Sequence, residues 1–398
     1  MSFDFVPTLV EAAVLALSLY LLRRFPLPSM LAAAGLGYAL RPGSREYPAG
    51  RAGTMRGVVF TAPGLGVRSM DAKLRSDVPL PGHLSSQLLV KVRAAGLNPS
   101  NFKVNMARLP FFRHTKSGNH VVGYDVEGVV VGVGKDCAAR FAVGDAAYGF
   151  ASGGSIAEYA VMQCGMAGHS PKRLTPLQTA GLPVVALTSM VAWDRTDLSR
   201  GQRALVIGAS GGCGNFGVTL GKAVGAHITG LCSARNIPLV KSLGADAVVD
   251  YKDPHDMESL ESRGPQFDVI YDTVSSFAPE DPDYETPMRP LLKPGGKYVS
   301  INGGKMDWTR GLLEEFVFMP LFGLSIQRPD FDLFIVRPTA ANLDRLTKLI
   351  DEENLPATVI DQVFPLNADA VDVAFRRMKS RRAVGKIVFD MTEISRES

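Results

Sequence analysis

The sequence predicts an α/β protein in which an antiparallel β-barrel is followed by a doubly wound parallel sheet. Between residues 55 and 183, short β-branched runs alternate with glycine and proline, a pattern typical of antiparallel strands joined by turns. From residue 203 onward strand and helix patterns alternate, as in a parallel sheet covered by helices. That alternation begins with an apolar strand, a glycine-rich turn and a helix ending near Gly225, in segment 203–225.

The barrel half is predicted from strand-like segments that start at residue 55. Further strands are expected at 87–95, 126–133 and 155–161. A helix with regular apolar spacing is expected over 183–197, leading into the glycine-rich strand.

The second half is predicted to contain a βαβ unit followed by more alternating elements. Strands are expected at 203–207, 226–232, 247–250, 267–271 and 296–301, with an amphipathic helical segment at 288–293. Two helices are then expected at 342–350 and 368–379, followed by a strand at 385–389. We expect that last strand to return to the barrel. The predicted domains are therefore 1–50, 51–183, 184–328 and 329–398.

The first fifty residues form an apolar N-terminal segment and linker. Residues 5–22 are almost wholly apolar apart from Glu11, and Arg23 and Arg24 precede a second apolar run over 25–40. Each run is short for a membrane span, which needs about 20 apolar residues. We expect a membrane anchor with the catalytic part in the cytosol, since positive charge follows the first run. A mitochondrial targeting segment and a packed non-membrane helix are the alternatives.

Composition excludes several classes of protein. The chain has 398 residues, 46% apolar and 21% charged, with a net charge of +4, which is enough for two domain cores and too little basic charge for a nucleic-acid partner. The four cysteines occur singly, without a C-x-x-C pair. This spacing argues against a disulfide framework and a structural zinc site, and favours a reducing compartment.

The glycine-rich turn is predicted to bind a pyrophosphate. Its glycines lack the Cβ atoms that would keep a phosphate from the backbone, and the following helix directs free N–H groups and its positive dipole end at the anion. A plain surface turn is the alternative, but the βαβ context argues against it. The expected cofactor contacts in this turn are Ala209, Ser210, Gly211, Gly212, Cys213 and Gly214.

The end of the second strand indicates NADPH rather than NADH. NADH sites usually place a carboxylate there for the ribose hydroxyl, whereas this chain has Ser233 and Arg235, and no carboxylate before Asp246. A hydroxyl and a guanidinium suit a 2′-phosphate. Lys222 and Tyr251 are expected to add charge and donors on the same side. Alternatively, the basic side chains here are solvated surface charges.

Five ordered motifs resemble the medium-chain dehydrogenase/reductase superfamily, in its zinc-independent quinone oxidoreductase-like branch. The resemblance covers about residues 55–391, and its carriers are AAGLNPSNFK (94–103), GYDVEGVV (123–130), FAVGDAAYG (141–149), ASGGCG (209–214) and AVGKIVF (383–389). It implies a GroES-like barrel as catalytic domain and a Rossmann domain for the cofactor. Relatives are often dimers, so a homodimer is possible.

The resemblance also implies that no metal is bound. Zinc-dependent relatives carry cysteine and histidine where this chain has Asn98 and Tyr124, and neither residue offers a thiolate or imidazole ligand. Without a Lewis acid, hydride transfer is expected to go to a small molecule that is already electrophilic, such as a quinone or an α,β-unsaturated carbonyl.

Asn98 and Thr188 are the expected catalytic residues, because their family counterparts line the nicotinamide site. Alternatively, Asn98 only shapes a turn before Pro99, and Thr188 bonds back to a helix carbonyl, with Ser189 then in its place. The tyrosine that many relatives carry is missing from segment 108–112. A non-catalytic, membrane-associated protein that binds NADPH is therefore the alternative function.

Overall fold

The computed structural model describes residues 53–60, 72–101, 120–275, 282–301, 330–334 and 336–392. The predicted N-terminal anchor at 5–22 and segment 108–112 lie outside these residues. Within the described ranges, no helix combines the length and apolar character needed to cross a bilayer.

The barrel domain is built from two sheets. β3 pairs antiparallel with both β5 and β7, so strands β3, β5, β6 and β7 close on themselves around an apolar core. A smaller sheet has the order β2-β1-β4. The strands are β1 (Thr54–Phe60), β2 (Ala72–Pro79), β3 (Gln87–Leu97), β4 (His120–Val121), β5 (Asp125–Val133), β6 (Ala146–Ala151) and β7 (Tyr159–His169).

The sheet of the second domain is parallel throughout its described strands, in the order β10-β9-β8-β11-β12-β13. This is the order of a doubly wound dinucleotide-binding fold, in which the ligand site lies where the order reverses, beside β8. Apolar clusters cover both faces of the sheet. The strands are β8 (Arg203–Ile207), β9 (His227–Cys232), β10 (Ala247–Asp250), β11 (Phe267–Asp272), β12 (Leu292–Ser300) and β13 (Phe331–Leu333).

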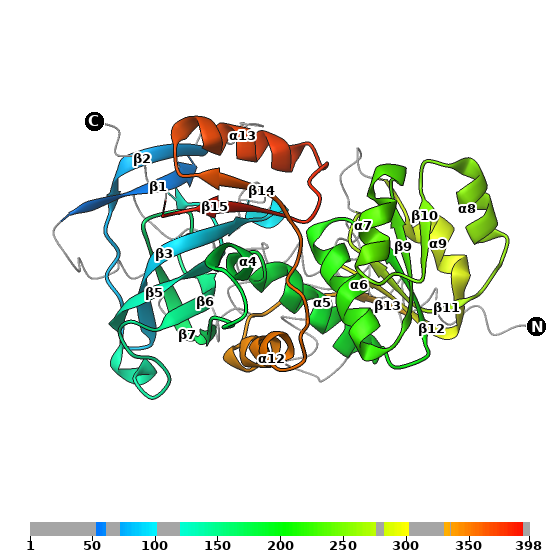
Figure 1. The fold of residues 1–398 in the computed structure, drawn as a ribbon, viewed down its shortest axis with the longest axis horizontal. Helices are drawn as coiled ribbons and strands as arrows, with labels where there is room; N and C mark the ends of the chain where they lie inside the picture. Colours follow the sequence, from blue (N-terminus) through cyan, green and yellow to red (C-terminus); the bar gives the residue numbers. More distant parts are fainter. Residues whose placement is uncertain are drawn as a thin grey trace, which may run out of the picture. The chain divides into compact units, whose positions relative to one another are not determined.

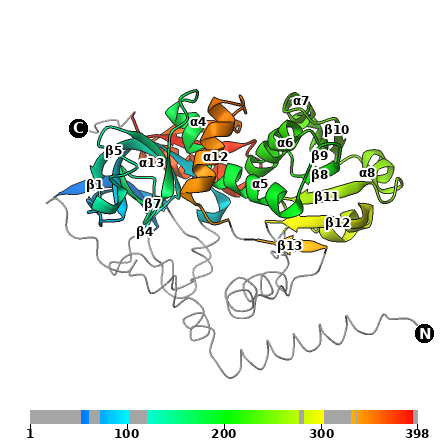
Figure 2. The same cartoon turned by 90° about the horizontal axis from the view of Figure 1, so that it is seen from below.

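Helices cover the parallel sheet and join it to the barrel. α6 (Gly212–Val224) follows β8 and packs against α5 (Pro183–Thr196), and α7 (Ile237–Ser242) and α8 (Pro254–Glu261) flank β10 in the chain. α5 begins directly after the barrel's short helix α4 (Pro176–Ala180), which Thr175 caps through a hydrogen bond with Gln178. α12 (Ala340–Asp351) lies beside α5 and β7 (Figure 2).

The chain returns to the barrel for its last two strands. β14 (Ile360–Pro365) and β15 (Lys386–Asp390) pair in parallel, and β15 pairs antiparallel with β3. α13 (Ala368–Lys379) connects them and lies across this end of the sheet (Figure 1). Its buried face consists of apolar side chains at helical spacing, including Val371, Ala374 and Met378.

Three local expectations differ from the structure. The segment 288–293 is not one helix: α9 (Glu285–Met288) is followed by a 3-10 turn (Arg289–Leu291) that contains Pro290, and β12 begins at Leu292. β13 lies beyond residue 328 and still belongs to the parallel sheet. β14 was not expected from the sequence, because its half-exposed pattern shows no regular alternation.

Cys137 and Cys164 form a disulfide, which corrects the expectation of separate cysteines. Their Cα atoms are 5.7 Å apart although 27 positions separate them in the chain. Cys137 lies in a 3-10 turn after β5 and Cys164 in β7, and barrel closure brings these segments together. Local cysteine spacing could not reveal this pair. Cys213 and Cys232 remain free thiols.

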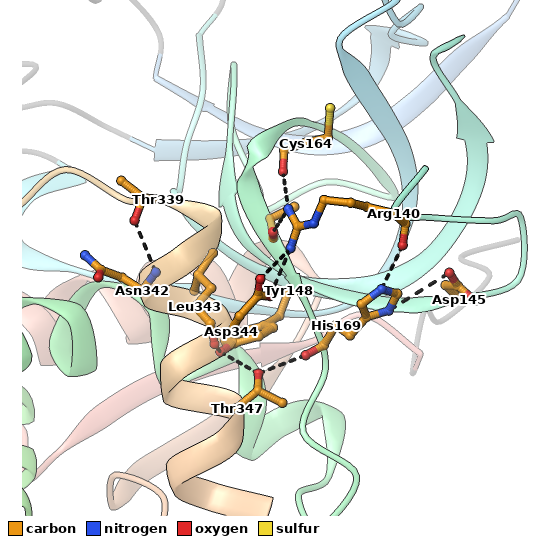
Figure 3. Close-up of polar contacts among 11 residues, drawn as sticks. Arg140, Asp145, Tyr148, Cys164, His169, Thr339, Asn342, Leu343, Asp344 and Thr347 are labelled. Atoms are coloured by element: carbon orange, nitrogen blue, oxygen red, sulfur yellow. Dashed lines mark hydrogen bonds and ion pairs between the residues drawn. The ribbon is translucent and has the colours of Figure 1, made fainter. Parts of the chain in front are cut away.

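Polar contacts beside this disulfide hold α12 against the barrel (Figure 3). The Arg140 guanidinium donates to the Cys164 carbonyl at 2.9 Å and to both carboxylate oxygens of Asp344 on α12, each at 2.9 Å. The Tyr148 hydroxyl donates to the Leu343 carbonyl at 2.9 Å. α12 in turn packs on α5, so these contacts help to place the helix that carries Thr188.

Candidate active site

The glycine-rich turn contains two glycines that the fold requires. Gly208 has φ +77°, and a Cβ on it would lie 2.5 Å from a Val274 side-chain atom. A Cβ on Gly214 would lie 2.1 Å from the Gly208 carbonyl oxygen. A side chain on Gly208 would clash with the segment that follows β11, and one on Gly214 would push the start of α6 away from the end of β8.

Gly211 is different, because the fold places little demand on it. Its φ of −78° suits any residue, and the nearest atom to an added Cβ is the Gly208 carbonyl oxygen at 3.3 Å. It occupies the cap position of α6, where no side chain bonds the free N–H groups of the first turn. The turn therefore leaves room for a phosphate against the helix N-terminus, which fits a dinucleotide.

The C-terminal strand supports this turn from the barrel side. The Gly385 N–H donates to the Ser210 carbonyl at 2.9 Å, and Gly211 and Gly385 form a parallel bridge. A second, buried hydrogen bond joins α6 to the segment before β14: the Thr358 hydroxyl donates to Oδ1 of Asn215 at 2.6 Å. The glycine-rich turn thus touches the barrel directly, so a cofactor bound there would lie close to barrel residues.

The end of β9 contains a small polar cluster that includes one unexpected residue. Asn236 Nδ2 donates to the Ser210 hydroxyl at 2.9 Å and to the Ser233 hydroxyl at 3.3 Å. The Tyr251 backbone N–H donates to the Cys232 carbonyl at 3.1 Å, which places Tyr251 beside Ser233. Asn236 therefore links Ser210 to Ser233, and the backbone of Tyr251 lies next to Ser233 while its ring packs edge-on against Tyr284.

Arg235 lies exposed at the start of the segment that follows β9. Its charge acts on Asp361 of β14. Burial favours a higher pKa for Asp361, but a hydrogen bond from Arg377 and the charges of Arg377 and Arg235 hold this pKa below its usual range. Arg235 thus borders the polar cluster and remains open to an anionic ligand.

Lys222 lies away from the predicted cofactor contacts. It is in the last turn of α6, ten residues after Gly212, which at the rise of an α-helix is about 15 Å. Its ammonium donates to the carboxylate oxygens of Asp246 at 2.9 and 3.0 Å and to the Ala226 carbonyl at 3.3 Å. We therefore leave Lys222 out of the proposed cofactor site.

Asn98 belongs to a buried network with Asp125 and Lys386. Asn98 Nδ2 donates to Asp125 Oδ2 at 2.9 Å, and Lys386 Nζ donates to Asn98 Oδ1 at 2.5 Å and to Asp125 Oδ2 at 2.9 Å. All three residues are at most 2% exposed. The other Asp125 oxygen accepts from the Val184 N–H at 2.9 Å, in the first turn of α5. Asn98 thus does more than shape a turn.

Thr188 lies on α5 beside the glycine-rich turn. Its hydroxyl interacts with the thiol of Cys213, in the first turn of α6. Burial raises the pKa of this thiol to about 11, while the charge of Lys386 and hydrogen bonds with Tyr271 and Thr188 act to lower it. It is the neighbouring Ser189 that bonds back to a helix carbonyl, at 3.0 Å to Val185, and it also donates to the Cys213 carbonyl at 2.9 Å. Thr188 therefore keeps its hydroxyl on the turn side of the helix.

Metal ligands do not gather in the part of the chain that the structure describes. No group of three or more His, Cys, Asp or Glu side chains is suitably arranged there. At the two positions where zinc-dependent relatives carry ligands, Asn98 is bound to Lys386 and Asp125, and burial raises the pKa of Tyr124 to about 12. Tyr124 is therefore a neutral phenol near pH 7 and can donate a hydrogen bond.

Sequence reasoning missed Lys386, Asp125 and Asn236. Lys386 stands in the AVGKIVF motif and Asp125 in GYDVEGVV, so both lay within segments that were singled out. Their roles were hidden because a lysine or aspartate in a strand pattern gives no sign of a partner hundreds of positions away. Asn236 carried no signal beyond its closeness to Arg235.

Two protein families match this chain. Residues 85–172 match the alcohol dehydrogenase GroES-like domain, and residues 243–389 match the zinc-binding dehydrogenase family. These ranges fall on the barrel and on the parallel sheet with its C-terminal return.

Individual proteins match over most of the chain. A chloroplastic quinone-oxidoreductase homolog of Spinacia oleracea is 31% identical, covering 80% of this chain and 94% of its own. A trans-enoyl reductase of Aspergillus terreus is 30% identical, and the match covers 81% of this chain and 92% of the relative. A mitochondrial NAD(P)H oxidoreductase of Mus musculus is 32% identical, and the match covers 78% of this chain and 83% of the relative. The solved quinone oxidoreductase of Coxiella burnetii has a TM-score of 0.68 and 25% identity, covering 85% and 99%.

Proposed function

Because this chain belongs to the medium-chain dehydrogenase/reductase superfamily, in its quinone oxidoreductase-like branch, we propose that it reduces quinones or α,β-unsaturated carbonyls with NADPH. Relatives named as a quinone oxidoreductase homolog and as a trans-enoyl reductase support these two acceptor classes. The observation that carries the proposal is the contact between the glycine-rich turn and the barrel strand that reaches Asn98.

The cofactor is proposed to lie along the turn at the N-terminus of α6. Gly211 leaves room for its pyrophosphate, and the uncapped N–H groups of α6 would bind the charge. When bound, the reduced nicotinamide supplies a hydride to an acceptor carbon. Ser233, Arg235 and Tyr251 would hold the adenosine 2′-phosphate, which is the basis for preferring NADPH over NADH.

The barrel residues are proposed to orient the acceptor and to stabilise its oxygen. Asn98 directs one N–H of its amide to Asp125, and we propose that the second donates to the acceptor's carbonyl oxygen. We propose that the Thr188 hydroxyl, which acts on the Cys213 thiol at the start of α6, contacts the nicotinamide or the acceptor. A hydrogen bond to the oxygen that gains negative charge lowers the barrier to reduction.

Turnover by the full-length protein tests this proposal. We would follow NADPH absorbance against a series of quinones and enones, before and after exhaustive chelation, and determine zinc by mass spectrometry. We expect acceptor-dependent oxidation of NADPH that survives chelation, and a higher kcat/KM with NADPH than with NADH. Tight NADPH binding without turnover of any acceptor would favour the non-catalytic alternative instead. Stoichiometric zinc whose removal abolishes activity would contradict the metal-free mechanism.

A further inference from the structure

The chemistry of its two partners determines which way the Asn98 amide points. A lysine ammonium can only donate, and a carboxylate can only accept. Lys386 Nζ lies 2.5 Å from Asn98 Oδ1, and Asp125 Oδ2 lies 2.9 Å from Asn98 Nδ2. A flipped amide would set N–H against ammonium and oxygen against carboxylate. Asn98 can therefore offer an incoming ligand only its second Nδ2 hydrogen as donor.

All three N–H groups of the Lys386 ammonium have acceptors in this network. Its three N–H groups reach the Leu97 carbonyl at 3.2 Å, Asn98 Oδ1 and Asp125 Oδ2. The side chain is 3% exposed, and its ion pair with Asp125 at 2.9 Å is shielded from solvent. In a low-dielectric site, a cation on the amide oxygen withdraws electron density and makes the amide N–H a stronger donor.

The same side chain reaches from the cofactor turn to Asn98. Its Cδ lies 3.3 Å from the place where a Gly212 Cβ would stand, and its charge acts on the Cys213 thiol. Lys386 therefore spans the space between the first turn of α6 and the end of β3. Its polarising effect falls where the proposed site brings acceptor and cofactor together.

We propose that Lys386 is a positioning residue that polarises Asn98 toward the acceptor oxygen, with Asp125 fixing the amide from the other side. This proposal rests on the proposed function. As a hydride reaches the acceptor carbon, the carbonyl π electrons move to its oxygen, and a proton from solvent later neutralises that charge. Lys386 and Asp125 neither gain nor lose a proton in this scheme.

The principal test neutralises the ion pair as a whole, in the full-length protein. Asp125→Asn with Lys386→Met removes both charges and leaves no isolated buried charge. The matched control is Arg93→Gln with Glu127→Gln, which neutralises an ion pair between β3 and β5, the strand that also carries Asp125, away from Asn98. Melting temperature, NADPH dissociation constant, kcat and KM are measured for both.

We expect the two double variants to lose similar thermal stability and to bind NADPH like the unsubstituted protein. Only Asp125→Asn/Lys386→Met should lose kcat, by about tenfold or more, with little change in KM, because the polarised donor matters most when charge develops. In an Asn98→Leu background the same double substitution should cause no further loss of kcat, since Lys386 acts through Asn98.

Equal kcat values in the two double variants would overturn the inference, as would a full additional loss in the Asn98→Leu background. Should Asp125→Asn/Lys386→Met not fold, Asp125→Asn/Lys386→Gln keeps an N–H donor at position 386 and removes both charges, and the same fall in kcat at unchanged NADPH affinity is expected. If the unsubstituted protein turns over no acceptor, the proposed function itself is wrong. If the protein is active but its kcat does not depend on the ion pair, only this inference is wrong.

Discussion

At the scale of single residues, Arg235 is proposed to set the preference for NADPH over NADH. Arg235→Ala should weaken NADPH binding by about 1–2 kcal/mol, roughly five- to thirty-fold, and leave NADH binding nearly unchanged, because it removes a charge-assisted bond to a 2′-phosphate. Isothermal titration with both cofactors measures this.

Lys222→Ala is the matched control for Arg235, because it removes an equal charge from the far end of α6, where Lys222 pairs with Asp246. Its ratio of NADPH to NADH affinity should stay unchanged. If the unsubstituted protein bound both cofactors equally, or if Lys222→Ala shifted the ratio as much as Arg235→Ala, the assignment of Arg235 would be wrong.

Distance along the chain explains why some site residues could be named from the sequence and others could not. Ser233 and Tyr251 follow strand ends, and strand ends can be located from local apolar patterns. Lys386 and Asn98 are 288 positions apart, and Lys386 and Asp125 are 261 apart. No local pattern connects residues at such separation.

At the scale of elements, the turn between β8 and α6 contains glycines that the fold requires and one, Gly211, that we propose serves the cofactor. Gly211→Ala should leave the melting temperature almost unchanged but weaken NADPH at least about tenfold, because the new methyl group occupies the phosphate space. Cofactor titration and thermal unfolding of the same sample give both numbers.

Gly214→Ala should behave in the opposite order. A Cβ there would stand 2.1 Å from the Gly208 carbonyl oxygen, so we expect a loss of about 2 kcal/mol or more in the free energy of unfolding. A Gly211→Ala protein as unstable as Gly214→Ala would show that Gly211 serves packing, and the phosphate site would lose its main support.

The disulfide between the turn after β5 and strand β7 closes a loop of the barrel. With 27 positions between Cys137 and Cys164, the chain-entropy relation gives about 3–4 kcal/mol of stabilisation. Reduction should therefore lower the melting temperature of the unsubstituted protein but not of Cys137→Ser/Cys164→Ser. Alkylation of the denatured, unreduced chain should label only Cys213 and Cys232; four labelled cysteines would show that the bond is absent in the isolated protein.

At the scale of the whole molecule, the first fifty residues and the rest of the chain are predicted to be separable. Burying the apolar side chains of 5–22 in a bilayer contributes about 1.5–3 kcal/mol each, so full-length protein should remain in the membrane fraction after carbonate extraction. A protein starting at Arg51 should be soluble and bind NADPH, since the cofactor turn and the returning strand β15 lie downstream.

Two results would contradict that prediction in different ways. Full-length protein that is soluble without detergent, together with a truncated protein that misfolds, would place the apolar segment in a globular core. Import and cleavage in isolated mitochondria would favour the targeting alternative, in line with the mitochondrial and chloroplastic relatives.

What the sequence determined by itself is local along the chain. The βαβ unit, the glycine-rich turn and the helix 183–197, found as α5 (Pro183–Thr196), each depend on residues within a few positions of one another. Apolar periodicity and glycine placement follow from backbone geometry at that range, so they can be read without the fold.

The tertiary structure decided which distant segments meet. Barrel closure joined Cys137 to Cys164, and the return of β15 to β3 brought Lys386 to Asn98 and Asp125. It also paired Lys222, ten positions after Gly212 along α6, with Asp246. A buried charge needs a partner, but its type and spacing do not say which one; only the packing of strands from both ends of the chain does.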